Sequence, residues 1–331
     1  MSGPQSITTL QGHILEQQAS HPEATGTFSW ILSALSISAK IIADKVRRAR
    51  LEPVLGSVGS ENVQGEQQQK LDVIANDVLL RTLGRREGVA IVASEENEEP
   101  VLLRNDPLGE RRYCVLFDPL DGSSNLDVCG GVGTIFSILR HDRRASRAED
   151  SILQAGTQQV AAGYVLYGSS TVFVLTIGQG VDMFVLDPAI GAFLRVEQGI
   201  RIPAASKNYS LNEGNRLGFP EGYQRYLDWA QRNGYSGRYV GAMVADVHRI
   251  LLKGGVFMYP PTTKAPNGKL RLMYEANPMS MLIEQAGGKA LAAPGQRILD
   301  VQPTDIHQRT PIVLGSPDEV DHVMARLADA G

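Results

Sequence analysis

The chain has 331 residues, 43% of them hydrophobic and 21% charged, which is typical of a globular protein with one large domain or two joined halves. Its formal net charge of −4 argues against nucleic acid as the main partner. The apolar runs are too short to predict a membrane-spanning helix, and the first residues lack the pattern of a signal peptide. The two cysteines, Cys114 and Cys129, favour a reducing cytoplasm, and neither has the spacing of a zinc site.

Helical periodicity predicts two helices early in the chain, over residues 25–48 and 67–86. Strand patterns then dominate residues 89–193. Turns within that stretch are expected at Gly163, Gly168 and Gly178. The glycine-rich run of residues 130–133 precedes a strand pattern instead of a helix, so it indicates close packing or strand-end geometry and not a dinucleotide loop.

A polar break at residues 195–218 separates this stretch from a second half, in which helices alternate with short strands. The helices there are predicted over residues 223–232, 244–252, 279–286 and 317–328. This order predicts a layered, mixed α/β protein made of two joined halves, residues 1–195 and 196–331.

The most informative segment is Asp118-Pro119-Leu120-Asp121-Gly122-Ser123-Ser124-Asn125, which follows an apolar run. Two carboxylates lie three positions apart where a strand gives way to a loop, and Pro119 prevents a helix from continuing through them. Carboxylates bind hard cations, and small residues rich in N–H and hydroxyl donors bind phosphate. The segment therefore predicts a place where Mg²⁺ and a phosphate meet, although the same residues are common in plain turns.

Further acidic residues follow other expected strands. Glu95 and Glu96 come directly after the apolar residues 89–93, and because neighbours on a strand point to opposite sides, they should have different roles. Glu275 ends an alternating pattern over residues 269–275, which predicts a strand followed by an Asn-Pro helix start. Because sites in α/β folds gather beyond the C-terminal ends of strands, these acids are expected to belong to one site.

In order along the chain, the motifs resemble class 1 fructose-1,6-bisphosphatase from about residue 8 to the last helix. The segments that carry the resemblance are 62–66 (NVQGE), 94–96 (SEE), 118–125 (DPLDGSSN), 209–214 (YSLNEG), 238–246 (RYVGAMVAD), 268–271 (GKLR) and 275–278 (EANP). The segment 118–125 alone indicates only the wider superfamily of Mg²⁺-dependent sugar and inositol phosphatases, whereas the later segments are more specific. The resemblance implies the sugar-phosphatase fold, with alternating α and β layers.

The same resemblance implies Mg²⁺-dependent hydrolysis of the 1-phosphate of fructose 1,6-bisphosphate, in gluconeogenesis or the Calvin cycle. It implies two or more Mg²⁺ ions per subunit, which Mn²⁺ can replace. Asp118 is implied to bridge two ions. The full set of implied ligands is Glu95, Asp118, the Leu120 carbonyl, Asp121 and Glu275.

Asp72 and Glu96 are implied as a carboxylate pair that acts on the attacking water. Asp72 taken alone is an ordinary acid in the first turns of a helix, where it favours the macrodipole. By resemblance, the loop of residues 51–70 is expected to swing as a lid that delivers Asp72, with Arg271 pairing with Glu66 on closure.

For the substrate, the resemblance implies two phosphate sites and a sugar site. The reacting phosphate would lie against Asp121, Gly122, Ser123 and Ser124. The second phosphate would bind Asn212, Tyr239, Tyr259 and Lys269, and Gly241 and Met243 would line the sugar. Arg238 would reach the second phosphate from a neighbouring subunit, which implies an oligomer, with a homotetramer expected. Position 215 is Asn where the family commonly has a phosphate-binding Tyr.

An inhibitory AMP site is also implied, at the start of the first predicted helix. Its candidate residues are Thr25, Gly26, Ser29, Arg112, Tyr113 and Arg140. A helix N-terminus with hydroxyl groups binds phosphate well, although Thr25 is equally suited to be a plain N-cap. Ser29 stands where Thr is typical of the family, and Arg112 where Lys is typical.

Three other functions stay open. Sedoheptulose 1,7-bisphosphate, alone or in addition, is the closest rival substrate, because it shares the ketose phosphate end. A monophosphatase such as one for inositol phosphate would leave the second phosphate site without a purpose. A catalytically silent nucleotide-binding regulator would have no need to keep all the carboxylates.

Overall fold

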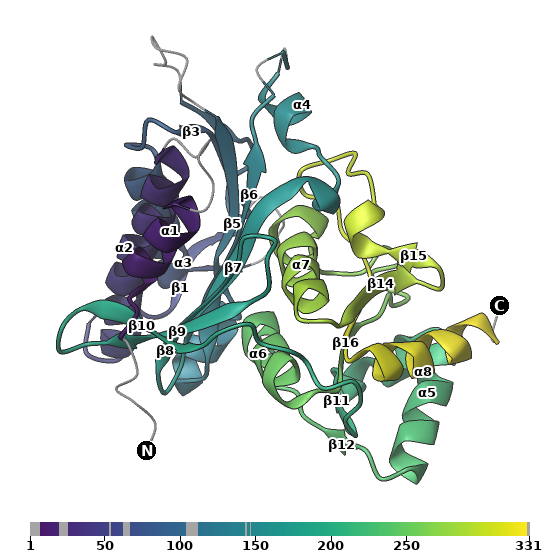
Figure 1. Ribbon diagram of the computed structural model, residues 1–331. Helices are drawn as coiled ribbons and strands as arrows, with labels where there is room; N and C mark the ends of the chain where they lie inside the picture. Colours follow the sequence, from purple (N-terminus) through teal and green to yellow (C-terminus); the bar gives the residue numbers. More distant parts are fainter. Residues whose placement is uncertain are drawn as a thin grey trace.

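The structure is a computed structural model that describes residues 7–19, 26–52, 54–61, 67–103, 112–142, 144–145 and 147–329. Within these residues, helical layers alternate with two large sheets (Figure 1). The layers are, in order, α1 (Leu10–Ala19), α2 (Thr27–Arg48) and α3 (Lys70–Leu83); an eight-stranded sheet; α6 (Met243–Lys253) and α7 (Asn277–Gln285); a six-stranded sheet; and α5 (Glu221–Arg232) and α8 (Pro317–Ala328). The predicted layered α/β class is confirmed.

The eight-stranded sheet is built from the first part of the chain. Its strands lie in the order β10 (Ala192–Glu197), β9 (Asp182–Asp187), β8 (Thr171–Thr176), β7 (Gln159–Tyr167), β6 (Val132–Arg140), β5 (Tyr113–Asp121), β3 (Val89–Ser94) and β4 (Val101–Leu102). Neighbouring strands are antiparallel, except that β3 and β5 are parallel. The C-terminal ends of β3 and β5 therefore lie side by side. Glu95 follows β3, whereas Asp118 and Asp121, expected where a strand gives way to a loop, lie in the last residues of β5.

The six-stranded sheet is built from the second part. Its order is β12 (Ser236–Gly237), β11 (Asn208–Ser210), β13 (Val256–Tyr259), β16 (Ile312–Gly315), β14 (Lys289–Ala293) and β15 (Gln296–Arg297). The four helices predicted for this half are α5 to α8, each within two residues of its predicted bounds. Two small elements remain: the hairpin of β1 (Ser57–Glu61) and β2 (Gln67–Gln69) before α3, and α4 (Ala148–Ile152) after β6.

Strand β5 is buried on both faces. Val115 and Phe117 belong to the apolar core under α2 and α3, whereas Cys114 and Leu116 belong to a cluster on the opposite face. This alternation follows from the two-residue period of a strand. Cys114 is a buried core thiol, as predicted.

Helix α2 is long and apolar enough to cross a membrane by length and composition alone, but half of its most apolar window is buried inside the fold. Its inward residues, among them Leu35 and Ile42, join the core cluster that also holds Leu79 of α3. A partly buried hydroxyl pair, Ser38 with Thr82, joins α2 to α3. This packing is that of a core helix.

The second predicted helix begins later than expected. Residues 67–69 form β2, and α3 begins at Lys70. The Asp72 carboxylate accepts the backbone N–H of Gln69 at 2.9 Å, which fixes the helix start at that point. Helix α1 was not predicted from the sequence.

Two strand-based predictions are wrong. Residues 272–276 form a π-helical turn that continues into α7, because the Glu275 carboxylate accepts the N–H of Arg271 at 2.6 Å and closes the turn. Gly163 lies inside β7 and not in a turn; a Cβ there would come within 2.4 Å of the Phe136 ring, so its small size serves packing. Gly168 and Gly178 do lie in bends between strands.

Helix α6 is joined to the large sheet by a partly buried polar contact. The Tyr164 hydroxyl of β7 lies 2.7 Å from Nδ1 of His248 on α6. Burial lowers the pKa of His248 to about 4. The folded protein therefore holds the imidazole neutral at pH values where an unfolded chain would protonate it.

We predict an acid-sensitive loss of stability that depends on His248. Because the folded pKa is depressed, the unfolded state binds the extra proton first, so stability is full above pH 6.5 and falls as the pH approaches 4. Between pH 7 and pH 5 the wild type should lose about 2 kcal/mol more than His248→Gln, which keeps an acceptor for Tyr164. Urea unfolding at both pH values measures the difference; equal losses in both proteins would contradict it.

Candidate active site

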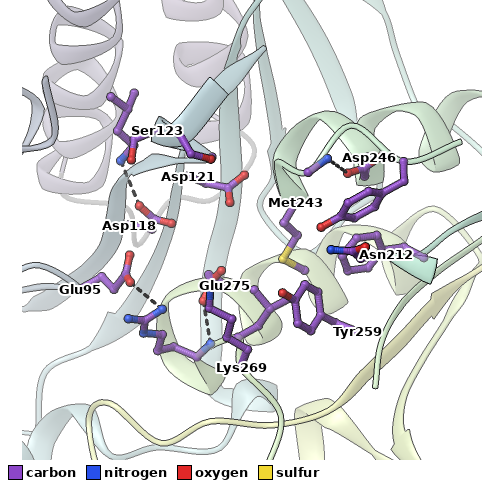
Figure 2. A pocket seen from close by; sticks show the side chains of 18 of the residues that line it. Glu95, Asp118, Asp121, Ser123, Asn212, Met243, Asp246, Tyr259, Lys269 and Glu275 are labelled. Atoms are coloured by element: carbon purple, nitrogen blue, oxygen red, sulfur yellow. Dashed lines mark hydrogen bonds and ion pairs between the residues drawn. The ribbon is translucent and has the colours of Figure 1, made fainter. Parts of the chain in front are cut away.

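A cavity of about 530 Å³ lies beyond the ends of β3 and β5 and is closed by residues from the second half of the chain. Figure 2 shows its two sides: Glu95, Asp118, Asp121 and Glu275 lie on one, Asn212 and Tyr259 on the other, with Met243 between them. The cavity thus has an acidic end with these four carboxylates and an opposite end with the Asn212 amide and the Tyr259 hydroxyl.

The acidic end is built by the parallel pairing of β3 with β5. Ser94 pairs with Phe117, and the N–H of Glu95 donates to the Phe117 carbonyl at 3.0 Å, so Glu95 and Asp118 leave the two strands side by side. The turn before α7 brings Glu275 to the same place. Carboxylate oxygens of Asp118, Asp121 and Glu275, all buried, lie within 4.8 Å of one another.

The electrostatics of this cluster are unfavourable. Burial, followed by repulsion from Glu95, Asp121 and Glu275, raises the pKa of Asp118 well above its usual range. Burial also raises the pKa of Asp121 to about 7, although N–H groups of Val244 and Met243 at the start of α6 oppose the shift. The Val244 N–H donates to Asp121 at 2.7 Å.

One arginine compensates part of this charge. The Arg271 guanidinium lies 2.9 Å from the Glu95 carboxylate, and both side chains are buried. Glu95 therefore lies in the cluster but is paired with Arg271. The expected partner of Arg271 on lid closure, Glu66, lies outside the described residues.

The donor set fits a hard divalent cation. It consists of buried carboxylate oxygens that converge on a few ångströms and repel one another, which is the arrangement that oxygen-seeking ions stabilise. Asp118, Asp121 and Glu275 have the converging geometry. Leu120 lines the same cavity, and its N–H donates to Asp118 at 2.9 Å.

Asp72 lies beside this cluster at the start of α3. Burial raises the pKa of Asp72 to about 7. The N–H of Gln69 opposes this shift, and the charge of Glu96 adds to it. A hydrogen bond with Ser123 also opposes it. The structure thus places Asp72 next to both Glu96 and Ser123. Glu96 and Ser123 line the cavity themselves.

The segment after β5 passes close to the start of α6. Gly122 has a φ of 75°, and a Cβ there would come within 2.3 Å of Ala242. Glycine is therefore required by both the backbone conformation and the close approach. Gly122, Ser123 and Ser124 line the cavity beside the carboxylates.

The remaining substrate candidates also line the cavity. These lining residues are Asn212, Tyr239, Gly241, Met243, Tyr259 and Lys269. Burial, then the neighbouring Tyr259, raises the pKa of Tyr239 to about 12, so its hydroxyl stays protonated and can donate. Arg238 and Asn215 are exposed and do not line the cavity of their own chain.

Asp246 is a site residue to which the sequence assigned no role. It is 1% exposed, lines the cavity, and accepts the N–H groups of Val240 and Gly241 at 2.9 and 3.0 Å. In sequence it is only an acid in the first turn of an apolar helix. Its position shortly after the predicted Tyr239 and Gly241 was the available signal.

The AMP-site candidates gather at the other end of β5. Gly26 precedes α2 with a φ of 75°, and the rings of Phe28 and Tyr113 lie 5.7 Å apart. Tyr113 pairs with Arg140 across β5 and β6. Arg112 comes directly before Tyr113, and Ser29 donates to Gln18 at 2.7 Å. Thr25 lies outside the described residues.

Family models match almost the entire chain. The model described as Fructose-1-6-bisphosphatase, N-terminal domain, matches residues 8–198, and the C-terminal domain model matches residues 202–328. The chain is 50% identical to a class 1 fructose-1,6-bisphosphatase of Chlorobium chlorochromatii (strain CaD3), over 95% of this chain and 96% of that protein. It is 48% identical to that of Chloroherpeton thalassium (strain ATCC 35110 / GB-78), over 95% and 91%.

Solved structures agree with these matches. The fold is similar to Leishmania major fructose-1,6-bisphosphatase in holo form, with a TM-score of 0.91, 41% identity, and coverage of 97% of this chain and 99% of that one. For the same enzyme in the T-state, the TM-score is 0.88 and the identity 40%, over 98% and 99%. The chain therefore belongs to the class 1 fructose-1,6-bisphosphatase family and is a phosphoric monoester hydrolase.

Proposed function

We propose that the chain catalyses Mg²⁺-dependent hydrolysis of the 1-phosphate of D-fructose 1,6-bisphosphate, giving fructose 6-phosphate for gluconeogenesis or a reductive pentose cycle. The observation that carries the proposal is a single cavity with four carboxylates at one end, the Asn212 amide and the Tyr259 phenol at the other, and the Lys269 ammonium in its lining. A bisphosphate needs both ends, because binding of the non-reacting phosphate at one end orients the reacting phosphate ester at the acidic end.

At the acidic end, Asp118, Asp121 and Glu275 would hold the ion, with Glu95 and the Leu120 carbonyl as further ligands. When bound, Mg²⁺ would neutralise charge on the phosphoryl oxygens and on the departing sugar oxygen. The backbone N–H groups of Leu120, Val244 and Arg271 fix the orientation of the three converging carboxylates. These carboxylates therefore need little reorganisation during the reaction.

Asp72 and Glu96 are positioned to take a proton from the attacking water. In the reaction, an oxygen–phosphorus bond forms to water, the bond from phosphorus to the sugar oxygen breaks, and the sugar oxygen gains a proton. The Asp72 carboxyl is buried beside Glu96 and Ser123, and its pKa, raised to about 7 mainly by burial, is close to that of an efficient general base near neutral pH. The expected lid, residues 51–70, includes residues 53 and 62–66, which lie outside the described residues, so delivery of Asp72 by this loop stays a prediction.

At the donor end, Asn212, Tyr239, Tyr259 and Lys269 would bind the 6-phosphate, and Gly241 and Met243 would contact the sugar. Asp246 holds the turn that carries Tyr239 and Gly241 through two N–H groups. Arg238 is exposed directly before Tyr239, which supports a role in a neighbouring subunit's site within a homotetramer.

We also propose inhibition by AMP at the start of α2. The positive end of the helix macrodipole at Gly26, the Tyr113 ring and the Arg140 guanidinium come from elements that meet at one end of β5. A nucleoside monophosphate needs an anion site and a face for its base, and these groups supply both kinds of contact.

Phosphate release tests the main proposal. With Mg²⁺, the wild type should release phosphate from fructose 1,6-bisphosphate, and a chelator should abolish release. Asp118→Asn should lower the rate by at least about 1,000-fold, yet raise the free energy of unfolding in chelator by about 1 kcal/mol, because it removes one of the repelling charges.

Sedoheptulose 1,7-bisphosphate and inositol 1-phosphate, assayed in parallel, define the substrate range. Asp77→Asn is the matched control for Asp118→Asn, since Asp77 is exposed on α3 and pairs with Arg81. Full chelator-resistant turnover, or an active Asp118→Asn enzyme, would overturn the role of the ion.

AMP inhibition should weaken in Arg140→Ala. Loss of a charged contact to phosphate should raise the AMP concentration for half-inhibition about 10-fold or more, relative to each enzyme's own uninhibited rate. Arg144→Ala is the control, because Arg144 is an exposed arginine on the loop after β6 and pairs with Asp142. Unchanged inhibition in Arg140→Ala would show that AMP acts elsewhere.

Asp246→Asn should act on substrate binding. The amide can accept only through its one oxygen, so one of the two N–H groups of Val240 and Gly241 loses its acceptor and the turn loosens. We expect KM to rise about 10-fold, corresponding to about 1.4 kcal/mol, with a much smaller change in kcat. Steady-state kinetics measure both constants, and a fall in kcat alone would contradict the assignment.

A further inference from the structure

The relative direction of Asp118 and Asp121 is not that of a regular strand. Residues three positions apart on a strand point to opposite faces of the sheet. Yet the carboxylate oxygens of these two residues lie within 4.8 Å of each other. Asp118 lies opposite Ile135 of β6 and Asp121 opposite Gly133, so three steps along β5 match only two along β6.

This mismatch is a β-bulge of one residue. The alternation of side chains between the two faces of β5 shifts by one residue at the same place, as the core shows. Phe117 and Leu120, also three positions apart, both belong to the cluster under α2 and α3. The bulge therefore turns both apolar side chains to one face and both aspartates to the other. Without it, Asp121 would face the apolar core.

A buried hydroxyl is bonded to the bulge. Thr134 of β6 is 2% exposed, and its hydroxyl donates to the Pro119 carbonyl at 2.8 Å. Pro119 has no N–H, and the N–H of Leu120, the other residue in the bulge, donates to the Asp118 carboxylate at 2.9 Å. The Pro119 carbonyl still needs a donor. The Thr134 hydroxyl supplies the hydrogen bond that this carbonyl needs in an apolar environment.

Tyr167 of β7 continues the contact. Its hydroxyl lies 2.9 Å from that of Thr134, and because the Thr134 proton is directed at Pro119, Tyr167 must be the donor of this bond. The surroundings of the pair include Leu35 of α2 and Leu79 of α3, and the packing gap there has no room for a water molecule. The chain of hydroxyls from β7 through β6 to β5 thus has one consistent arrangement of protons.

We propose that Thr134 and Tyr167 are positioning residues of the hydrolytic site, acting through the Pro119 carbonyl to hold Asp118 and Asp121 on one face of β5. Neither residue lines the cavity. The inference rests on the proposed role of the two aspartates as ion ligands. Residues that orient ligands in this way typically alter ion affinity or activity by about 10–100-fold when their contact is removed.

The test uses the full chain and Mn²⁺ alone as the probe, with free Mn²⁺ followed by electron paramagnetic resonance, and Mg²⁺-dependent phosphate release measured beside it. Thr134→Val keeps the shape and removes the hydroxyl; we expect Mn²⁺ binding about 10-fold weaker and kcat at least about 10-fold lower. Thr134→Ser keeps the hydroxyl and should restore both to within about threefold. Tyr167→Phe should give a smaller loss in the same direction.

Thr176→Val is the matched control, because Thr176 lies in the same sheet, is 1% exposed, and bonds only the N–H of Gly178 among the described contacts of its hydroxyl. It should lose stability like Thr134→Val in urea melts, with Mn²⁺ binding unchanged. If Thr134→Val does not fold, Tyr167→Phe decides. The inference would be overturned if the wild type binds Mn²⁺ and the variant that decides the test has the same Mn²⁺ affinity and the same kcat. Failure of the wild type to bind Mn²⁺ would instead overturn the ion site itself.

Discussion

Mutual repulsion of buried carboxylates is the constraint on which this structure depends. Asp118, Asp121 and Glu275 converge within 4.8 Å, and each accepts a backbone N–H, from Leu120 at 2.9 Å, Val244 at 2.7 Å and Arg271 at 2.6 Å. An amide orients a carboxylate without cancelling its charge. The fold therefore fixes the direction of the acids and holds them close together, which lowers stability; in the proposed function, a bound cation would relieve this repulsion.

These three N–H groups come from elements that only the packed fold brings together. The Leu120 N–H belongs to β5 and the Val244 N–H to α6, and Arg271 precedes the turn that leads into α7. The first lies in the range of the N-terminal family model, and the other two lie in the range of the C-terminal one. The acidic end of the cavity is thus complete only when both halves are packed. The contact between Tyr164 and His248 supports this packing, because it joins α6 to the large sheet.

The sequence predicted the composition of the site well and its geometry poorly. The prediction that Glu95 lies beyond a strand end is confirmed, because a strand followed by acids is a local pattern. Asp118 and Asp121, expected in a loop, instead lie in the last residues of β5. The bulge that turns Asp121 toward Asp118 was not predictable, since it is recognised by Thr134 and Tyr167, which are distant in sequence. The alternating pattern predicts a strand at Glu275, but its side chain accepts the N–H of Arg271 and supports a helical turn, which the hydrophobic pattern does not reveal.

Strand β5 has the AMP-site candidates at Tyr113 and the acids at its other end, but it is an unsuitable carrier of motion between them. Both of its neighbours, β3 and β6, hold it in register, so it cannot slide alone. The helical layer offers another route. Helix α2 begins at the AMP end, packs against α3 and is bonded to it by Ser38 and Thr82, and α3 begins at Asp72 beside the acids. A ligand that binds at Gly26 and shifts α2 over the sheet would move α3 with it, so the group displaced at the active site would be Asp72 and not the strand-borne carboxylates.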